Sequence, residues 1–232
     1  MKPINLSKLD NYVDFGYFSQ NIARKSLKRS IKDRIKAWGL DKDYYDGERS
    51  CGYGGFTDDG RWLKLLPNLL RLCGEHSENI DDFSILDVGC KKGFLVDAAI
   101  KLGYPALGIE NHIYPITKAN KKIKHKLISG NYYDLPFADN SFEFCIAFSS
   151  IYMQNLKEVM ETLSEINRVA RSSFISVAAY NHDWEKDSFY NWTLLGTTVL
   201  HCSEWIDLFS SIGYQGKYFF TTPSILGFQK DD

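Results

Sequence analysis

Short apolar runs alternate with stretches of helical periodicity from about residue 61 to residue 180. Continuous apolar runs predict buried strands, and apolar residues spaced three and four apart predict amphipathic helices. The strands expected on this basis cover 84–88, 106–110, 126–128, 142–148 and 173–179. The helices expected between them cover 61–74, 93–102, 114–122 and 155–170. Alternation of this regularity is typical of a parallel sheet with helices on both faces.

The first 60 residues depart from this pattern because they are rich in aromatic and charged residues. They predict one helix over about 20–39 and then a glycine-rich turn region. We therefore expect an N-terminal helical and lid segment over 1–60 and one α/β domain over 61–232. The last fifty residues are expected to add one helix and two strands to this domain.

The turn after the first strand of the domain carries Gly89 and Gly93. Ligands bind at the carboxyl ends of the strands in open parallel sheets. Glycine lets the backbone approach a ligand closely, and the free amides of a helix start favour an anionic group. A dinucleotide-binding turn would have glycine where Lys91 and Phe94 stand, and a phosphate-binding loop would end in Gly-Lys-Ser/Thr. Neither pattern is present.

The segment Ile85-Leu86-Asp87-Val88-Gly89-Cys90-Lys91-Lys92-Gly93-Phe94 resembles motif I of class I S-adenosylmethionine-dependent methyltransferases, with Lys91 in place of the middle glycine. Further matches follow in order, since Glu110 ends the second strand and Gly130-Asn131-Tyr132-Tyr133-Asp134 precedes the fourth. The resemblance implies a doubly wound, mostly parallel seven-stranded sheet of the Rossmann-like methyltransferase fold. It also implies S-adenosylmethionine as the cofactor.

The resemblance further implies roles for single residues. Glu110 would accept hydrogen bonds from both ribose hydroxyls, which its charge strengthens. Asn131, where the family usually has aspartate, would accept from the adenine amino group, and the main-chain amide of Tyr132 would donate to a ring nitrogen. The residues expected to bind the cofactor are Asp87, Gly89, Cys90, Gly93, Phe94, Glu110, Asn111, Asn131, Tyr132 and Phe148.

A second resemblance lies upstream, in Tyr44-Tyr45-Asp46-Gly47-Glu48-Arg49-Ser50-Cys51-Gly52-Tyr53-Gly54-Gly55-Phe56. This segment, rich in tyrosine, glycine and arginine, is similar to the one before the core in a subgroup of small bacterial methyltransferases linked with surface-polysaccharide or small-metabolite biosynthesis. Glycines between aromatic residues can fold over a ligand and exclude water, and arginine can pair with an anionic acceptor. The alternative is a tight turn packed on the core. The residues expected to bind the acceptor are Arg49, Tyr53, Arg61 and Asn155.

Candidates for catalysis follow the fourth and fifth strands, at Tyr152, Tyr180 and His182. The imidazole of His182 suits base work at neutral pH, although a surface histidine is the alternative interpretation. Methyl transfer from a sulfonium is a direct displacement, so orientation supplies much of the rate. A general base is required only for an acceptor that arrives protonated with a high pKa.

A net charge of −1 argues against a general nucleic-acid binder. The stretch 24–36 is an exception, because it carries seven lysines and arginines against one aspartate. Its apolar residues form one helical stripe of Leu27, Ile31, Ile35 and Trp38. The basic face is either solvated or attracts an anionic partner. An RNA or protein methyltransferase that uses this helix therefore stays open, as does a non-catalytic cofactor-binding subunit.

The remaining features exclude other classes. The five cysteines have neither disulfide-framework nor zinc spacing, so free thiols and no metal are expected. No apolar run approaches the ~18 residues that span a bilayer, and the start lacks a signal-peptide core, which predicts a cytoplasmic protein without membrane insertion. The leading prediction is a methyl-transferring enzyme that acts on a small polar acceptor, either a sugar or a sugar-linked metabolite, without stable nucleic-acid binding.

Overall fold

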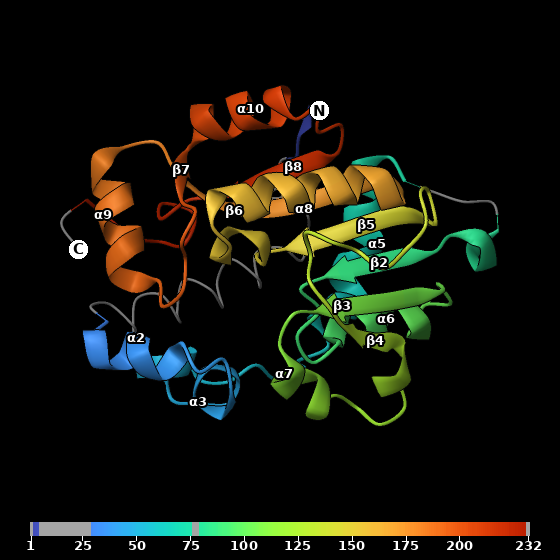
Figure 1. Cartoon of the computed structure of the whole chain (residues 1–232), viewed down its shortest axis with the longest axis horizontal. Coiled ribbons are helices and arrows are strands. Elements are labelled where there is room, and N and C mark those ends of the chain that lie inside the picture. The colour runs from blue at the N-terminus through green and yellow to red at the C-terminus, as the bar shows by residue number, and fades with distance from the viewer. Residues whose placement is uncertain (1, 5–28, 76–78, 231–232) are drawn as a thin grey trace.

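The computed structural model describes residues 2–4, 29–75 and 79–230 (Figure 1). Its strands are β1 (Lys2–Pro3), β2 (Ile85–Val88), β3 (Ala106–Glu110), β4 (Leu127–Ser129), β5 (Phe142–Phe148), β6 (Ala170–Tyr180), β7 (Leu200–His201) and β8 (Lys217–Thr221). The described strands form one sheet in the order β1-β8-β6-β5-β2-β3-β4, with β7 paired to β6. All pairings between them are parallel.

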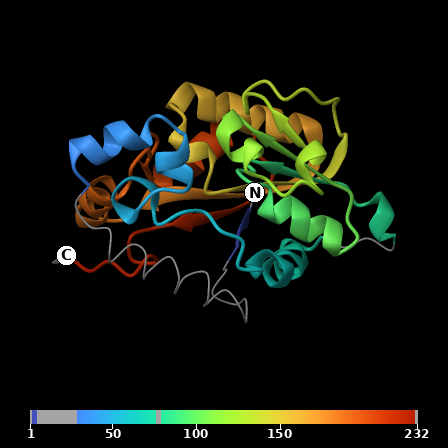
Figure 2. The same ribbon diagram turned by 90° about the horizontal axis from the view of Figure 1, so that it is seen from below.

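Helices cover both faces of the sheet (Figures 1 and 2). The described α-helices are α2 (Ile31–Ala37), α3 (Lys42–Tyr45), α4 (Arg49–Gly52), α5 (Arg61–Cys73), α6 (Phe94–Lys101), α7 (Ile113–Thr117), α8 (Leu156–Val169), α9 (Asp183–Trp192) and α10 (Cys202–Ser211). One apolar cluster joins α5 and α6 to the sheet, and a second joins α8 and α10 to the opposite face. The predicted doubly wound fold is therefore confirmed. The described strands number eight against the expected seven, and two of them, β1 and β7, have only two residues each.

Strand β5 illustrates why the central strands read as continuous apolar runs. Phe144 and Ile146 pack in the cluster under α5 and α6, whereas Cys145 and Ala147 pack in the cluster under α8 and α10. A strand that is buried on both faces has no polar side to alternate with. The prediction for this strand, 142–148, matches its observed bounds.

The strand order places a ligand-binding edge at the centre of the sheet. Strand β2 pairs with β3 on one side and with β5 on the other. The chain adds β3 and β4 on one side of β2 and β5 and β6 on the other, so the strand order reverses between β2 and β5. A crevice opens at the carboxyl ends of the strands at such a switch point. The hydroxyl of Ser150 donates to the carbonyl of Val88 at 2.7 Å, which ties the turn after β5 to the end of β2.

Helix α7 is shorter than the predicted 114–122, because it ends at Thr117. The side chain of Asn120 accepts a hydrogen bond from the amide of Lys122 at 3.0 Å. This local turn follows the end of the helix, and such side-chain turns compete with a helical backbone over the rest of the predicted range.

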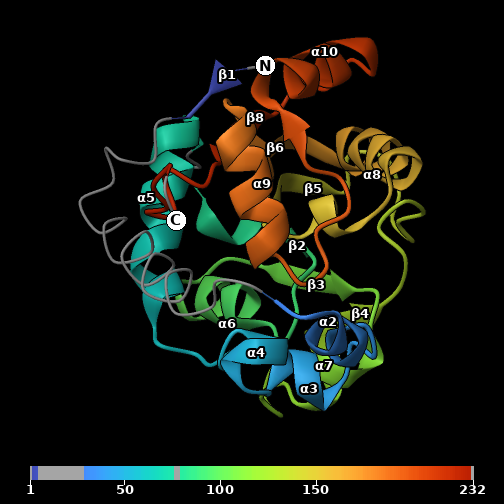
Figure 3. The same ribbon diagram turned by 90° about the vertical axis from the view of Figure 1, so that its left-hand side faces the viewer.

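Helices α2, α3 and α4 lie near α7, at the edge of the sheet (Figures 1 and 3). Of the helix expected over 20–39, residues 20–28 with Leu27 lie outside the described residues, and α2 begins at Ile31 behind the capping residue Ser30. The apolar stripe is not packed on the core, since Ile31, Ile35 and Trp38 are 69%, 65% and 74% exposed. None of the described helices is long and apolar enough to cross a membrane.

Candidate active site

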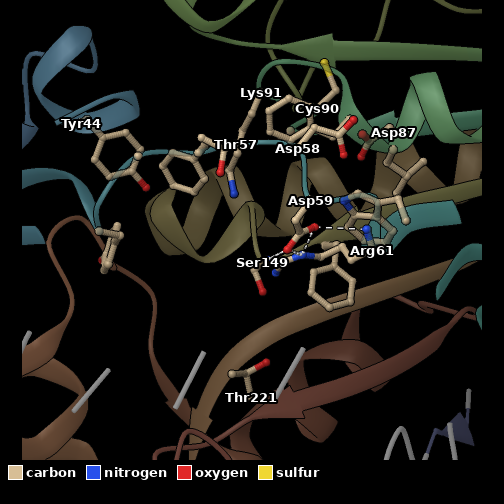
Figure 4. A pocket seen from close by; sticks show the side chains of 18 of the residues that line it. Tyr44, Thr57, Asp58, Asp59, Arg61, Asp87, Cys90, Lys91, Ser149 and Thr221 are labelled. Carbon is tan, nitrogen blue, oxygen red and sulfur yellow. Dashed lines mark hydrogen bonds and ion pairs between the residues drawn. The ribbon is translucent and has the colours of Figure 1, made fainter. Parts of the chain in front are cut away.

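Two adjoining cavities lie at the carboxyl edge of the sheet. The first has a volume of about 240 Å³ and the second of about 320 Å³. Tyr44, Gly89 and Lys91 line both of them, so the two spaces meet at the turn between β2 and α6. Figure 4 shows the first cavity, between the residues that precede α5 and the ends of β5 and β8.

The turn between β2 and α6 requires glycine at Gly89. Its φ is +84°, and a Cβ added there would lie 2.2 Å from the Cβ of Ser150. The amides of Gly89 and Cys90 both donate to the carbonyl of Ile109, at 2.9 and 3.1 Å. Gly93 also has a positive φ, but it lines neither cavity and lies against the side chains of Ile123 and Leu127.

Asp87 brings a buried carboxyl group to the first cavity. It is in the middle of the central strand β2, one residue before the strand ends, and only 5% of its side chain area is exposed. Burial raises the pKa of Asp87 to about 7, with Lys91 opposing and Glu110 adding to the shift. Three more predicted cofactor residues line the same cavity, namely Cys90, Phe94 and Phe148.

Glu110 is held by three donors and lines the second cavity. Its carboxylate accepts from the main-chain amides of Lys91 and His112, at 2.9 and 3.1 Å, and from the hydroxyl of Tyr132 at 3.1 Å. Burial raises the pKa of Glu110, although these hydrogen bonds oppose the shift. An acid that ends β3 is thereby oriented toward the space beside the turn.

The other residues expected around an adenosine divide into two groups. Asn111 and Tyr132 line the second cavity, and the hydroxyl of Tyr132 donates to the side-chain oxygen of Asn111 at 3.0 Å. Asn131 is exposed and lines neither cavity.

Residues 29–57, called the cover segment below, close one side of the two cavities. Tyr44, Tyr53 and Phe56 line the first cavity, and the rings of Tyr44 and Phe56 lie 5.6 Å apart. Trp38 and Leu40 line the second cavity. The cover segment therefore supplies aromatic walls to a site whose floor belongs to the sheet.

The cover segment is fastened to the turn after β2 at one end. The ammonium of Lys92 forms an ion pair with Asp46 and donates to the carbonyl of Phe56 at 2.8 Å. The hydroxyl of Tyr114 on α7 donates to Asp46 at 2.9 Å. Lys92 is buried, so this ion pair is shielded from solvent on its lysine side.

Other residues of the cover segment fasten it to the chain around α9. The guanidinium of Arg34 donates to the carbonyls of Tyr190 and Thr193. The hydroxyl of Tyr53 accepts from the amide of Leu194 at 3.0 Å. The segment thus bridges the carboxyl edge of the sheet from α7 to α9 (Figure 3).

The residues expected to bind an acceptor are only partly brought together. Tyr53 and Arg61 line the first cavity. The Nε atom of Arg61 donates to both carboxylate oxygens of Asp59, at 2.8 and 2.9 Å (Figure 4). Asn155 instead caps α8, accepting from the amide of Glu158, and lines neither cavity. The side chain of Arg49 lies outside the described residues.

Only one of the three residues predicted to act in catalysis lines a cavity. Tyr152 lines the first cavity, and burial raises its pKa, which keeps its hydroxyl protonated. Tyr180 packs its ring against His201, with centroids 5.5 Å apart. His182 is exposed at the start of α9. Neither Tyr180 nor His182 lines a cavity.

A chain of hydroxyl groups crosses the floor of the first cavity and was not predicted. The hydroxyl of Ser176 lies 3.3 Å from that of Ser149 and 3.1 Å from that of Thr221. Ser149 and Thr221 line the cavity from the ends of β5 and β8. Ser149 adopts a φ of +51°, which is uncommon for a residue other than glycine. The sequence signals Ser149 by its place after a strand, whereas nothing in the sequence signals Thr221.

The described residues contain no group of three side chains that could together hold a metal ion. All five cysteines are free thiols, four of them buried. Burial raises the pKa of the Cys90 thiol, so it is protonated at the edge of the cavity.

Comparisons with known proteins bear on this site. A family model for the methyltransferase domain matches residues 86–174. A search of curated proteins finds no match. Solved structures with the same fold include a candidate methyltransferase from Haloferax volcanii in complex with the Trm112 methyltransferase activator, with 18% identity and a TM-score of 0.53 over 79% of this chain and 76% of that one.

Two further structures show how far the likeness extends. The YcgJ protein from Bacillus subtilis has 18% identity and a TM-score of 0.51 over 65% of this chain and 67% of that one. The PH0226 protein from Pyrococcus horikoshii has 21% identity and a TM-score of 0.42, and the match spans 57% of this chain and 59% of that protein. At 18% identity the Haloferax volcanii and Bacillus subtilis structures show a shared fold.

Proposed function

We propose that this chain, whose core is a class I S-adenosylmethionine-dependent methyltransferase domain, binds its cofactor across the two cavities and methylates a small polar acceptor in the first. The observation that carries the proposal is that Gly89 and Lys91 line both cavities. A ligand whose sugar meets Glu110 in the second cavity therefore reaches the first by passing over this turn.

The residues at the turn fit the nucleoside and amino-acid parts of the cofactor. Gly89 leaves the space that a Cβ would fill, and Glu110 presents a carboxylate able to accept from two ribose hydroxyls. Asp87 faces the first cavity, where the ammonium of the amino-acid end would lie. When bound, S-adenosylmethionine supplies a methyl group on a sulfonium, which an acceptor atom displaces directly.

The far wall of the first cavity supports a ring-shaped acceptor that carries hydroxyl groups. An aromatic wall is formed there by Tyr152, Phe189 and Trp192. The rings of Phe189 and Trp192 meet edge to face, with their centroids 5.4 Å apart. Ser149 and Thr221 supply hydroxyls along the floor. Aromatic faces with a few placed polar groups are typical of small-molecule sites. A sugar or a sugar-linked metabolite is the acceptor class that we propose.

One buried donor in this wall also points to a polar acceptor. The Nε1–H group of Trp192 is buried and has no hydrogen-bond acceptor among the described residues. A buried donor without a partner is costly, and an oxygen on a bound acceptor would satisfy it. The variant Trp192→Phe keeps an aromatic ring of smaller size and removes this donor.

The basic stretch gives less support to an RNA or protein acceptor. Arg34 donates to main-chain carbonyls near the end of α9, and Arg29 donates to the carbonyl of Trp192 at 3.2 Å. These two guanidinium groups hold the cover segment. In the described part of the stretch Lys32 and Lys36 are exposed on α2, and Arg24, Lys25 and Lys28 lie outside the described residues. A small acceptor is therefore favoured.

The test is a screen of sugars, sugar nucleotides and small hydroxylated metabolites with methyl-labelled S-adenosylmethionine, read out by mass spectrometry. We expect one class to gain a single methyl group. Ser149→Ala and Thr221→Val should lower kcat/KM for that acceptor and leave cofactor affinity unchanged. Transfer to RNA or protein alone would overturn the acceptor class, and cofactor binding without transfer to any acceptor would favour a non-catalytic subunit.

A further inference from the structure

Lys91 occupies the centre of the turn in a conformation that lysine does not favour. Its φ is +52°, in the left-handed region where glycine is free of strain. For other residues this conformation costs roughly 1–2 kcal/mol. The main-chain amide of Lys91 already donates to Glu110, which a glycine would do equally well. The lysine side chain therefore needs its own explanation.

The side chain of Lys91 reaches into the space where the two cavities meet. Figure 4 shows it extending from the turn into the first cavity toward Thr57. Its ammonium lies 4.7 Å from the centroid of the Phe56 ring. Among the described residues no carboxylate forms an ion pair with this ammonium, whereas the adjacent Lys92 is paired with Asp46.

The ammonium of Lys91 thus belongs to a half-buried residue and has no ion-pair partner among the described residues. Burial lowers its pKa, although Glu110 and Asp87 oppose the shift. A partly desolvated charge without an ion-pair partner is unfavourable, and a ligand anion beside it would remove that cost. The cation–π contact with Phe56 offsets only part of it.

We propose that the ammonium of Lys91 binds the carboxylate of the cofactor's amino-acid end. The inference rests on the proposed placement of S-adenosylmethionine across the turn. In the first cavity Lys91 supplies a positive charge and Asp87 an acid, and Figure 4 shows their side chains apart from one another. The amino-acid end of the cofactor carries the complementary pair, a carboxylate and an ammonium.

This arrangement makes Lys91 a binding residue for the cofactor in place of the family's middle glycine. The cation–π contact with Phe56 keeps the ammonium at the border between the turn and the cover segment. The bound carboxylate would therefore also contact the inner side of the cover segment. An anionic group of the acceptor is the other possible partner for the same ammonium, and the experiment separates the two.

The experiment measures binding by titration calorimetry with two ligands. These are S-adenosylhomocysteine and its analogue that lacks only the carboxylate. Four proteins are compared, namely the natural chain, Lys91→Met, Lys91→Arg and Lys91→Gly. We expect Lys91→Met and Lys91→Gly to bind S-adenosylhomocysteine roughly tenfold to hundredfold more weakly, as for the loss of a charge-assisted hydrogen bond. Affinity for the analogue should change by less than about twofold.

Lys91→Gly separates this role from a structural one. Glycine relieves the strained φ, so the variant should melt at a temperature equal to or above that of the natural chain. It should nevertheless lose affinity for S-adenosylhomocysteine, while Lys91→Arg, which keeps the charge, should retain most of it. A purely structural lysine would move stability and affinity together.

Three results would overturn the inference. Equal losses for both ligands would show that Lys91 shapes the turn rather than binding the carboxylate. Unchanged binding of both ligands with a raised acceptor KM would assign the ammonium to the acceptor. Unchanged binding with unchanged KM would remove it from the site. Failure of the natural chain to bind either ligand would instead contradict the proposed function itself.

Discussion

The carboxylate of Glu110 accepts a hydrogen bond from the main-chain amide of Lys91 at 2.9 Å, so the acid that ends β3 fastens the turn that follows β2. The same carboxylate faces the second cavity. A single side chain therefore sets the conformation of the turn and offers oxygens to a ligand. Substitutions at Glu110 must separate these two effects.

Glu110→Gln should weaken cofactor binding by about 1.5–3 kcal/mol, the range of hydrogen bonds to charged groups. Glutamine keeps one oxygen for the amide of Lys91, but its NH2 group then faces the amide of His112, which donates to the other carboxylate oxygen in the natural chain. The melting temperature should therefore fall as well, and the affinity is measured at a temperature at which the variant is fully folded. Titration calorimetry with S-adenosylhomocysteine measures the affinity. Glu143→Gln, at the opposite end of β5, is the control and should bind normally. Natural affinity in Glu110→Gln would show that this acid does not hold the ribose.

Asp87 should make the unliganded protein less stable as the pH rises. Its folded pKa of about 7 exceeds the unfolded value of about 3.9, so the folded state holds an extra proton between these values. Stability is therefore lost over that window as the unfolded carboxyl ionises first. Asp87→Asn should melt above the natural chain at about pH 8 and alongside it near pH 4. The same difference in melting temperature between Asp87→Asn and the natural chain at both pH values would contradict this effect of burial.

The same carboxyl should make cofactor affinity depend on pH. An ammonium beside Asp87 favours the ionised form and lowers its pKa on binding. The affinity of the natural chain for S-adenosylhomocysteine should therefore rise between about pH 6 and pH 8, with proton release at the lower pH. Asp87→Asn should bind more weakly and show a flat profile. A rise of equal size in both proteins would place the titrating group elsewhere.

Gly89→Ala should cost more stability than the matched variant Gly213→Ala. Both glycines have positive φ angles, but a Cβ at Gly213 meets no atom within 4 Å, whereas one at Gly89 meets Ser150 at 2.2 Å. We expect a loss of about 1–2 kcal/mol at Gly213 from the backbone alone. Overpacking should bring the loss at Gly89 to about 2–5 kcal/mol. Urea denaturation measures both, and equal losses would show that the turn adjusts without cost.

Lys92→Met should loosen the cover segment without unfolding the core. The substitution removes the ion pair with Asp46 and the hydrogen bond to the carbonyl of Phe56. Hydrogen exchange of residues 42–57 should become faster, while exchange in β2 and β5 should stay slow. Lys101→Met, which breaks the ion pair between the exposed Lys101 and the buried Asp97 on α6, is the control and should leave the cover segment unchanged. Equal protection in Lys92→Met would show that the segment is held by its aromatic contacts.

The sequence predicts the core of the fold because its strands are buried on both faces. Runs such as 142–148 and 106–110 have no polar side, so their bounds follow from composition alone. The short α7 is harder to predict, because the buried apolar residues Ala119 and Ile123 continue a helical spacing beyond its end at Thr117. The exposed stripe of α2 is harder still. Its apolar periodicity indicates a packed face, but these residues are exposed, and the guanidinium of Arg34 holds the helix by donating to main-chain carbonyls at the end of α9.

The residues of the candidate site likewise fall into those that the sequence predicts and those that it does not. The turn and Glu110 can be predicted because consecutive strand ends of a parallel sheet lie at one edge. Thr221 cannot, since it joins Ser149 only through the pairing of β8 with β6, far along the chain. His182 follows a strand end as the pattern requires, but the start of α9 places it at the surface. The order of the strands in the sequence predicts which residues lie at the carboxyl edge of the sheet. The packing of the folded chain decides which of their side chains face the cavity.

The most direct measurement is a crystal structure of the natural chain with S-adenosylhomocysteine. We expect density for the nucleoside at the carboxyl edge, with the ribose hydroxyls on Glu110, the amino-acid end over Gly89 and the sulfur facing the first cavity. Density elsewhere, or none at saturating ligand, would contradict the claim that these two cavities form one cofactor site.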